Sequence, residues 1–243
     1  SLTPTGKTLL AYAKQIVELS NEAQRCLGMP DLDGIVRVGL PEWFANDQLQ
    51  EMLCHFARAH PAVKLEMQVG DSAMLRGFID DGELDIALAI CDPDKPSPKR
   101  FWKEPLVWVT CRDFSEHEEL PVILFARPCP YRPLADDALS SVGRQWKEVF
   151  TSSSVAAVRV AVRSGLGVSI LPAGAVESDL RILQPEDGFP ELPESKLTIY
   201  QTRAESNRTL HFLNEYLEHQ VGHAILKNSQ YAANVIPIRA GRI

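Results

Sequence analysis

A seven-residue repeat of apolar side chains runs through the first part of the chain. Most residues between the repeat positions are polar, and the apolar positions are Leu9, Tyr12, Ile16, Leu19, Ala23 and Cys26. Thr3 suits a helix N-cap and Pro4 the first helical position, and Gly28 and Pro30 end the pattern. The repeat predicts a helix over residues 3–27 that pairs with a partner helix. An amphipathic helix lying on its own domain is the alternative.

From residue 34 the pattern changes to short apolar or alternating runs separated by segments of helical periodicity. The expected strands cover residues 35–40, 63–69 and 84–90. The helix after the first strand is expected to be capped by Asn46 or Asp47, and the helix after the second strand by Ser72. Strands alternating with helices predict right-handed crossovers and a mostly parallel sheet.

A second unit with the same rhythm follows a Pro-rich stretch at residues 92–100. Its expected strands are residues 106–111, 122–125, 146–150, 168–171 and 197–201. Its expected helices cover residues near 133–142 and residues 155–163. A last helix is capped by Asn207, with an apolar face formed by Leu210, Leu213, Tyr216 and Leu217. Residues 221–243 lack strong periodicity and are expected to form a variable tail.

The composition is that of an ordinary globular protein. With 45% apolar, 23% charged and 7% aromatic residues among 243 positions, collagen-like, low-complexity and largely disordered classes are excluded. No run approaches the roughly 18 consecutive apolar residues that a membrane span requires, so no membrane partner is expected. The net charge of −7 argues against this surface binding nucleic acid by bulk electrostatics.

The five cysteines are odd in number, scattered and without a CxxC pair. A disulfide framework or a structural zinc site would need closer and paired spacing, so neither is expected. No secretory leader opens the chain, which begins with Ser1 rather than Met. The expected setting is therefore reducing and cytoplasmic, and the first residues read as though a further segment precedes them.

No catalytic, metal-binding or cofactor-binding constellation is visible in the sequence. The HExxH, GxSxG and P-loop patterns are absent. Gly165 and Gly167 follow a predicted helix and precede a strand, the reverse of a phosphate loop, so a turn that ends the helix is expected. His55 and His60 lack a carboxylate partner and are expected at the surface or its boundary. The chain is therefore not expected to be an enzyme.

Three short segments are candidates for ligand binding, because ligands of open α/β sheets bind beyond the carboxyl ends of strands. The first segment follows the first strand and consists of Pro41, Glu42, Trp43 and Phe44. Its two aromatic rings beside a carboxylate either line a pocket or plug an interface between lobes. The second segment contains Ser72, whose hydroxyl and neighbouring backbone N–H groups either receive an anion or simply cap a helix.

The third segment opens a helix with four consecutive hydroxyl side chains, Thr151, Ser152, Ser153 and Ser154. Four hydroxyl groups exceed what one helix cap requires, which predicts a ligand-binding role for this helix start.

Residues 127–132 read Arg-Pro-Cys-Pro-Tyr-Arg and follow a predicted strand directly. Positive charge from Arg127 and Arg132 would lower the pKa of the Cys129 thiol and favour a redox switch. The alternative is a small buried cysteine in a loop that the two arginines hold in place. Either arginine would also suit an anionic effector.

Several of these segments, in this order, resemble the LysR-type family of bacterial transcriptional regulators. The matching segments are residues 2–6, 34–39, 56–61, 82–87 and 162–172. The first is similar to the junction between the family's winged helix-turn-helix domain and its linker helix. The second and third are similar to the start of its effector-binding domain. The resemblance covers about residues 2–219.

The resemblance implies a fold like that of the type 2 periplasmic binding proteins, in the α/β class. Two Rossmann-like lobes are joined by crossover strands, preceded by a long linker helix, and enclose an effector cleft. The implied division is residues 1–29 for a dimerisation helix, 33–103 plus 199–219 for lobe I, 104–198 for lobe II and 220–243 for a C-terminal tail.

By this likeness the cleft is lined by the same three segments that the strand ends selected. Together with the unusual Cys–Arg loop, the candidate effector-binding residues are Pro41, Glu42, Trp43, Phe44, Ser72, Cys129, Arg132, Thr151, Ser152 and Ser153. Where members of the family bind carboxylates, hydroxyl groups at these loops receive the anion. Glu42 and Trp43 depart from that pattern, which weakens the case for an acidic effector. The family's paired redox cysteines are not evident, which counts against a redox switch at Cys129.

The leading functional hypothesis is therefore the regulatory portion of a LysR-type transcription factor. A small-molecule effector would bias the angle between the lobes, and a homodimer or tetramer would pass this change to DNA-binding domains that precede Ser1. A solute-binding protein that serves a transporter is the alternative, against which the heptad helix and the lack of a leader count. An enzyme of the same fold is a third possibility, but no nucleophile, metal set or general base is visible.

Overall fold

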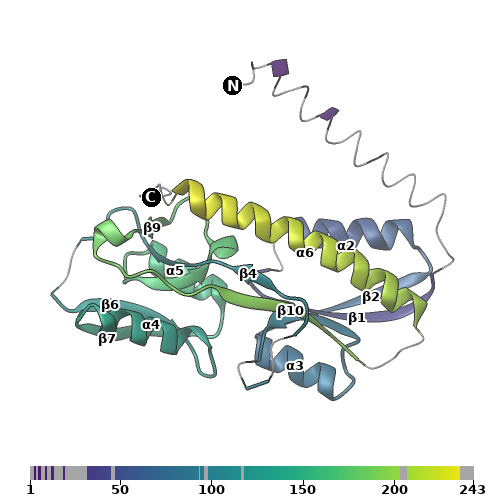
Figure 1. The fold of residues 1–243 in the computed structure, drawn as a ribbon, viewed down its shortest axis with the longest axis horizontal. Helices are drawn as coiled ribbons and strands as arrows, with labels where there is room; N and C mark the ends of the chain where they lie inside the picture. Colours follow the sequence, from purple (N-terminus) through teal and green to yellow (C-terminus); the bar gives the residue numbers. More distant parts are fainter. Residues whose placement is uncertain are drawn as a thin grey trace.

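Two α/β lobes lie side by side along the long axis of the molecule (Figure 1). The computed structural model describes residues 32–44, 47–92, 94–95, 98–115, 118–202 and 207–235, and the single positions 3, 5, 6, 9, 12, 13 and 19. For residues 47–51 and 229–235 the description is restricted to the backbone. Within these described residues, none of the helices is long and apolar enough to cross a lipid bilayer.

The predicted N-terminal helix lies mostly outside the described residues. At its start, the Thr3 hydroxyl accepts a hydrogen bond from the Gly6 N–H at 3.1 Å, as the predicted N-cap requires. Three positions of the apolar stripe are described as helical, and each is more than half exposed: Leu9, Tyr12 and Leu19. The other positions of the stripe lie outside the described residues, so the pairing of this helix with a partner stays a prediction.

The first lobe is built on one five-stranded sheet with the order β2-β1-β3-β10-β4. Its strands are β1 (Gly34–Pro41), β2 (Val63–Gly70), β3 (Ile86–Ile90), β4 (Trp102–Glu104) and β10 (Ser195–Gln201). β1 pairs in parallel with both β2 and β3, as the alternation of strands and helices predicted. β10 comes from the far end of the chain and runs antiparallel to β3 and β4, which completes the sheet.

Helices cover both faces of this sheet. They are α2 (Asp47–Ala59), α3 (Ser72–Asp80) and the first part of α6 (Arg208–Val235). α3 packs Leu75 and Ile79 against one face, in a cluster separate from the main core, while α2 and α6 cover the other face (Figure 1). The predicted caps of α2, Asn46 and Asp47, lie outside the described side chains.

The N-cap of α3 is Asp71, so the prediction that Ser72 caps this helix is wrong by one residue. The Asp71 carboxylate accepts hydrogen bonds from the backbone N–H groups of Ala73 and Met74, both at 2.9 Å. Ser72 lies inside the first turn, where its buried hydroxyl accepts the N–H of Ile90 at 3.0 Å. Its side chain therefore ties α3 to the end of β3.

The second lobe contains a three-stranded sheet of order β8-β5-β9 and a two-stranded sheet of β6 and β7. Its strands are β5 (Leu106–Thr110), β6 (Leu120–Phe125), β7 (Trp146–Ser152), β8 (Ser169–Pro172) and β9 (Arg181–Leu183). Its helical elements are α4 (Tyr131–Ser141), α5 (Val155–Arg163) and the 3-10 turns η1 (Ala173–Ala175) and η2 (Pro185–Asp187). A parallel bridge between Val122 and Val168 joins the two sheets into one layer.

The predicted strands and helices of this lobe are confirmed, with ends that differ by one to a few residues. β4 and β9, which have three residues each, were not predicted, because so short a run shows no periodicity. Gly165 follows α5 with a φ of +78°, so the predicted turn at the end of that helix is confirmed.

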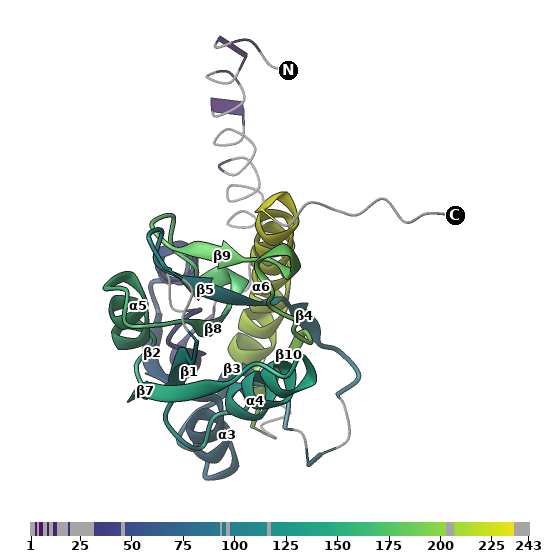
Figure 2. The same ribbon diagram turned by 90° about the vertical axis from the view of Figure 1, so that its left-hand side faces the viewer.

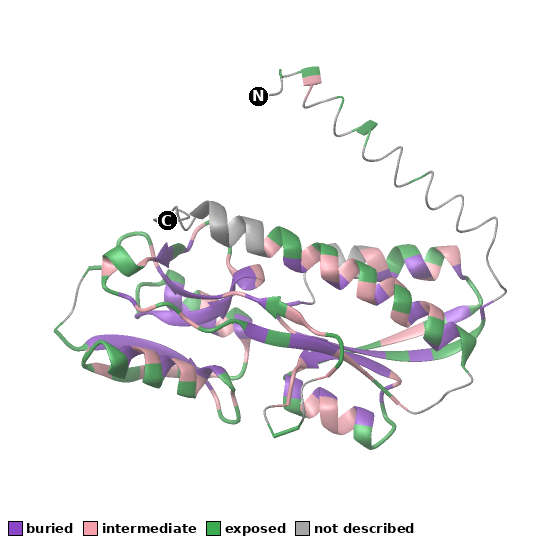
Figure 3. Cartoon of the chain, viewed as in Figure 1, coloured by how far each residue is buried: buried purple, intermediate pink, exposed green. Residues whose placement is uncertain are grey.

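α6 extends well beyond the helix that the sequence predicted. Its cap is as expected, because the Asn207 side chain accepts the N–H of Leu210 at 3.0 Å. The helix then continues to Val235 through the stretch expected to be a tail, and Val221 and Ile225 are buried along it. Figure 3 shows that buried positions recur along this helix. Small and polar residues between Val221 and Ile225 weakened the apolar pattern. Figures 1 and 2 show α6 running along both lobes, and it contacts β1, β4 and η1.

A buried carboxylate lies where the chain crosses between the lobes. Glu104 ends β4 and is fully buried; it accepts the N–H of Gly174 at 2.9 Å and faces the Asn228 amide at 3.4 Å. A Cβ on Gly174 would lie 2.3 Å from the Asn228 amide nitrogen, so a larger residue here would displace this amide. Burial raises the pKa of the Glu104 carboxyl to about 7. Glu104 thus joins the crossover strand, η1 of the second lobe and the end of α6.

We predict that Ile225→Ala lowers the free energy of unfolding by about 2–5 kcal/mol, because it removes a side chain that is 5% exposed. Leu226→Ala is the matched control: its side chain is 63% exposed, and the change should stay within about 0.5 kcal/mol. Urea unfolding followed by circular dichroism measures both. Equal effects of the two substitutions would mean that the end of α6 does not pack on the lobes.

We also predict that the wild type becomes less stable as the pH rises because of Glu104, and that Glu104→Gln does not show this decrease. From about pH 5 to pH 7 the carboxyl ionises in the unfolded chain but stays protonated in the folded one, so the free energy of unfolding of the wild type falls. The raised pKa sets an upper limit of about 3 kcal/mol for this loss, which is complete above pH 7. The variant should therefore gain stability over the wild type as the pH rises.

Urea unfolding at about pH 5 and about pH 8 measures the effect. Glu83→Gln, which removes an exposed carboxylate of the first lobe, serves as the control. The same pH dependence in Glu104→Gln and in the wild type would show that this carboxyl is already ionised at low pH in the folded protein.

Candidate functional site

A tight turn after β1 carries the first predicted segment. The Pro41 carbonyl accepts the N–H of Phe44 at 2.9 Å, which places Glu42 and Trp43 at the tip of the turn. Trp43 is 7% exposed and Phe44 2%, and their rings meet edge to face with centroids 5.0 Å apart. Of the two alternatives that the sequence left open, the structure favours rings that fill the interface between the lobes, since both side chains are buried.

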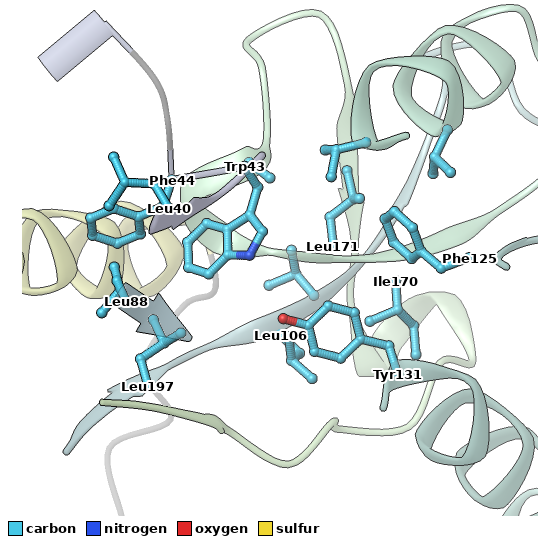
Figure 4. Close-up of a cluster of buried hydrophobic side chains, with 14 of the residues drawn as sticks. Leu40, Trp43, Phe44, Leu88, Leu106, Phe125, Tyr131, Ile170, Leu171 and Leu197 are labelled. Carbon is cyan, nitrogen blue, oxygen red and sulfur yellow. The ribbon is translucent and has the colours of Figure 1, made fainter. Parts of the chain in front are cut away.

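Trp43 lies between the lobes (Figure 4). On one side of its indole are Leu40 and Phe44 from the first lobe, and on the other Leu106 and Tyr131 from the second. All of these residues belong to one buried apolar cluster that runs through both lobes. The space where the cleft was expected is therefore filled by the chain's own aromatic side chains.

The Glu42 carboxylate reaches across to the N-terminus of α5 in the second lobe. Its two oxygens accept the backbone N–H of Val155 at 2.8 Å and of Ala156 at 3.2 Å. The Ser154 hydroxyl donates a third hydrogen bond to Glu42 at 2.9 Å. Two of the predicted segments, the turn after β1 and the start of α5, are thus in direct contact.

Two of the four hydroxyl groups before α5, those of Ser152 and Ser154, accept backbone N–H groups at the start of this helix. Ser154 is the N-cap, and its hydroxyl accepts the N–H of Ala157 at 3.3 Å. The Ser152 hydroxyl accepts the N–H of Ser154 at 3.1 Å. Thr151 is exposed and its hydroxyl bonds to the carboxylate of Glu148, and Ser153 is also exposed. Ser152 therefore lies at the helix start, whereas Thr151 is held by a neighbouring strand residue.

Cys129 and Arg132 do not form the activated thiol that the sequence allowed. Burial raises the pKa of the Cys129 thiol, and the smaller effect of the Arg132 charge does not reverse this. Arg132 donates to the Phe125 carbonyl at 3.0 Å and forms an ion pair with Glu148. Cys129 is half-buried rather than buried, and Arg132 holds this loop, so the structure favours an unreactive cysteine over a redox switch. The carboxylate of Asp71 in the first lobe also acts on Cys129, so this loop faces the start of α3.

Two buried hydroxyl groups of this region were not predicted from the sequence. Tyr131 and Ser195 bury hydroxyl groups near each other, and neither makes a well-formed hydrogen bond to a described residue. Burial raises the pKa of Tyr131. The sequence does not indicate that these two hydroxyl groups lie near each other. Tyr131 and Ser195 are far apart along the chain and come close only through β10.

His60 is buried, which corrects the expectation that it lies at the surface or its boundary. It is 5% exposed and packs between the rings of Phe56 and Phe212, at centroid distances of 4.7 and 5.6 Å. Burial lowers the pKa of its imidazole, so the neutral form is favoured. His55 is exposed, as expected.

Two surface pockets lie in the second lobe, and neither is lined by a predicted site residue. One, of about 560 Å³, lies between Val142 and the segment around η2. The other, of about 670 Å³, lies beside the end of α5 and is lined by Arg112, Arg163 and Asp179 among others. Among the described residues, no group of histidine, cysteine or acidic side chains is arranged to hold a metal ion.

Solved structures with the same fold are regulatory proteins. HinK, a LysR family transcriptional regulator from Pseudomonas aeruginosa, aligns with a TM-score of 0.61 and 18% identity over 92% of this chain and 82% of its own. The regulatory domain of MexT from the same organism aligns with a TM-score of 0.60 and 13% identity over 79% of this chain and 100% of its own. The CcmR regulatory domain of Synechocystis, solved in complex with 2-PG, aligns with a TM-score of 0.60 and 16% identity, over 79% of this chain and 98% of its own. At these identities the likeness shows the fold, which confirms the predicted architecture of two lobes.

Curated relatives and a family profile agree with the structural likeness. The HTH-type transcriptional regulator PecT of Dickeya dadantii is 27% identical over 197 residues, which is 80% of this chain and 62% of that protein. DgdR of Burkholderia cepacia is 28% identical over 220 residues, 90% of this chain and 74% of its own length. The profile of the LysR substrate binding domain matches residues 31–220. The chain therefore belongs to the LysR family of transcriptional regulators, and these residues are its substrate-binding domain.

Proposed function

We propose that this chain senses a small-molecule effector between its lobes and couples that binding to transcription. The observation that carries the proposal is the convergence of the turn after β1 and the start of α5, two segments far apart in the sequence, at the junction of the lobes. A ligand that prefers one arrangement of the lobes shifts the population toward it. The CcmR regulatory domain, which shares the fold, is in complex with 2-PG, and this supports a small molecule as the effector.

The proposed effector-binding residues are those that the sequence selected, Pro41, Glu42, Trp43, Phe44, Ser72, Cys129, Arg132, Thr151, Ser152 and Ser153. Trp43 and Ser152 are the two on which the proposal depends most. The indole fills the space between the lobes, and the Ser152 hydroxyl lies at the start of α5. An effector that enters this region has to replace the contacts that Trp43 makes there. We expect no catalysis, because the curated relatives are transcriptional regulators.

The proposed partners follow from the part of the relatives that this chain does not span. The chain spans 62% of the length of PecT, an HTH-type regulator, so DNA binding is assigned to a domain outside the present sequence. The partner of the N-terminal helix is a second copy of the chain, through the stripe that includes Leu9, Tyr12 and Leu19. The proposed setting is the cytoplasm. A solute-binding protein is not favoured, because the family and the relatives are regulators.

The division into lobes is also part of the proposal. Residues 33–103 and 199–219 would respond as one body and residues 104–198 as the other, with the dimer helix over residues 1–29 and a terminal segment over residues 220–243.

We predict that an effector found by a thermal-shift screen of metabolites stabilises the protein by about 2.7 kcal/mol at a hundred times its dissociation constant. The double variant Trp43→Ala, Ser152→Ala should lose this stabilisation, because it removes the indole between the lobes and a hydroxyl at the start of α5. Val160→Ala, on the exposed face of the same helix, should keep it. Undiminished binding by the double variant would place the effector elsewhere.

We predict a dimer or tetramer for the full chain and a monomer for residues 29–243, measured by light scattering. The reason is that deletion of residues 1–28 removes the apolar stripe, whose described members are more than half exposed on the present chain. The double variant Leu9→Glu, Leu19→Glu tests the stripe itself without shortening the chain. A monomer at every concentration with and without the helix would refute the proposed self-association.

A further inference from the structure

Glu42 is an anion held at a helix N-terminus by residues of the other lobe. The first N–H groups of a helix have no partner within it, and their aligned dipoles attract negative charge. α5 has no acidic residue in its own first turn. The charge that this helix end attracts is supplied by Glu42, which comes from the turn after β1 in the first lobe.

The hydrogen bonds leave no free donor in the first turn of α5. The N–H groups of Val155 and Ala156 go to Glu42, that of Ala157 goes to the Ser154 hydroxyl, and that of Ser154 goes to Ser152. A free carboxylate that approached this helix end would therefore meet occupied donors and the negative charge of Glu42.

The contact also closes the lobes on each other. Glu42 is followed directly by Trp43, whose indole packs against Leu106 and Tyr131 of the second lobe (Figure 4). Separating the lobes would break three charge-assisted hydrogen bonds and expose an indole that is 7% exposed when they are together. The hydrogen bonds of Glu42 and the burial of the Trp43 indole therefore both oppose separation of the lobes.

We propose that Glu42 is a built-in ligand of this cleft, which takes the place of a free carboxylate at the α5 N-terminus and holds the lobes closed without an effector. The inference deepens the proposed function, since it assigns the regulation of the same cleft. A carboxylate ligand competes with Glu42 for the amides of Val155 and Ala156. Removal of Glu42 opens the cleft and turns the helix end into a site for small carboxylates.

The first test titrates sodium acetate into the ¹⁵N-labelled chain and follows the amide resonances of Val155 and Ala156. The wild type should show no saturable shift. Glu42→Ala should show one, with acetate binding at least about tenfold tighter than to the wild type. Sodium chloride at equal ionic strength controls for screening. Glu83→Ala, which removes an exposed carboxylate of the same lobe, should behave like the wild type.

The second test measures closure through the indole. Acrylamide should quench the fluorescence of Glu42→Ala more strongly than that of the wild type. The added quenching should vanish in a Trp43→Phe background, which leaves the other three tryptophans as internal reference. Acetate should not restore the protection, because it fills the helix end without a covalent link to the first lobe.

Far-UV circular dichroism establishes that each variant is folded. If Glu42→Ala does not fold, Glu42→Gln replaces it, because the amide keeps the size of the side chain and removes its charge. Unchanged quenching together with no acetate-dependent shift in a folded variant would overturn the proposal. Neither test uses an effector or DNA, so a failed metabolite screen counts against the proposed function and leaves this inference standing.

Discussion

The pairing of β4 with β10 is the constraint on which the other contacts between the lobes depend. These two strands carry the chain from the first lobe into the second and back, and they pair antiparallel with Glu104 opposite Ser195. The Thr198 hydroxyl bonds to the Arg100 carbonyl at 2.7 Å beside this pairing. A change in the angle between the lobes has to bend the chain here, because the strands on either side are built into separate sheets. Tyr131 of the cleft lies beside this crossing, since Ser195 and Glu104 both act on its hydroxyl, so bending the strands changes the surroundings of the cleft residues.

The two carboxyl groups at the junction of the lobes, those of Glu42 and Glu104, differ in their exposure and in the number of hydrogen-bond donors around them. Glu42 keeps partial exposure and receives two backbone N–H groups and a hydroxyl, so its charge is well solvated by the protein. Glu104 is fully buried and receives one backbone N–H at 2.9 Å and a longer contact from Asn228. Because fewer donors replace the lost water, burial raises the pKa of Glu104 to about 7. The contribution of Glu104 to stability therefore depends on pH up to about pH 7.

The apolar pattern predicted two α/β units and the loops at the ends of their strands, because strands with strong apolar runs end at defined positions. That these units form two lobes with the loops between them came from the resemblance to the LysR-type family, and not from the pattern. It did not predict the length of α6, since Gly222 and Ala224 interrupt the stripe that Val221 and Ile225 continue. Nor did it choose between a pocket and a plug at Trp43, because that choice depends on how closely the lobes approach. The contact between Glu42 and α5 joins residues more than a hundred positions apart, and no local pattern carries such information.

Because the lobes of this regulator close on their own side chains, an effector must bind one arrangement of the lobes much more tightly than the other to change the equilibrium. To move a two-state equilibrium from about 1:99 to 99:1, a ligand has to bind one state about 5.5 kcal/mol more tightly than the other. Here the closed state already contains an anion at the helix end and an indole between the lobes. A ligand of the open state therefore works against both contacts, whereas a ligand of the closed state has to displace Trp43 while it keeps the lobes together. The effector is then selected as much by what it displaces as by the groups it contacts.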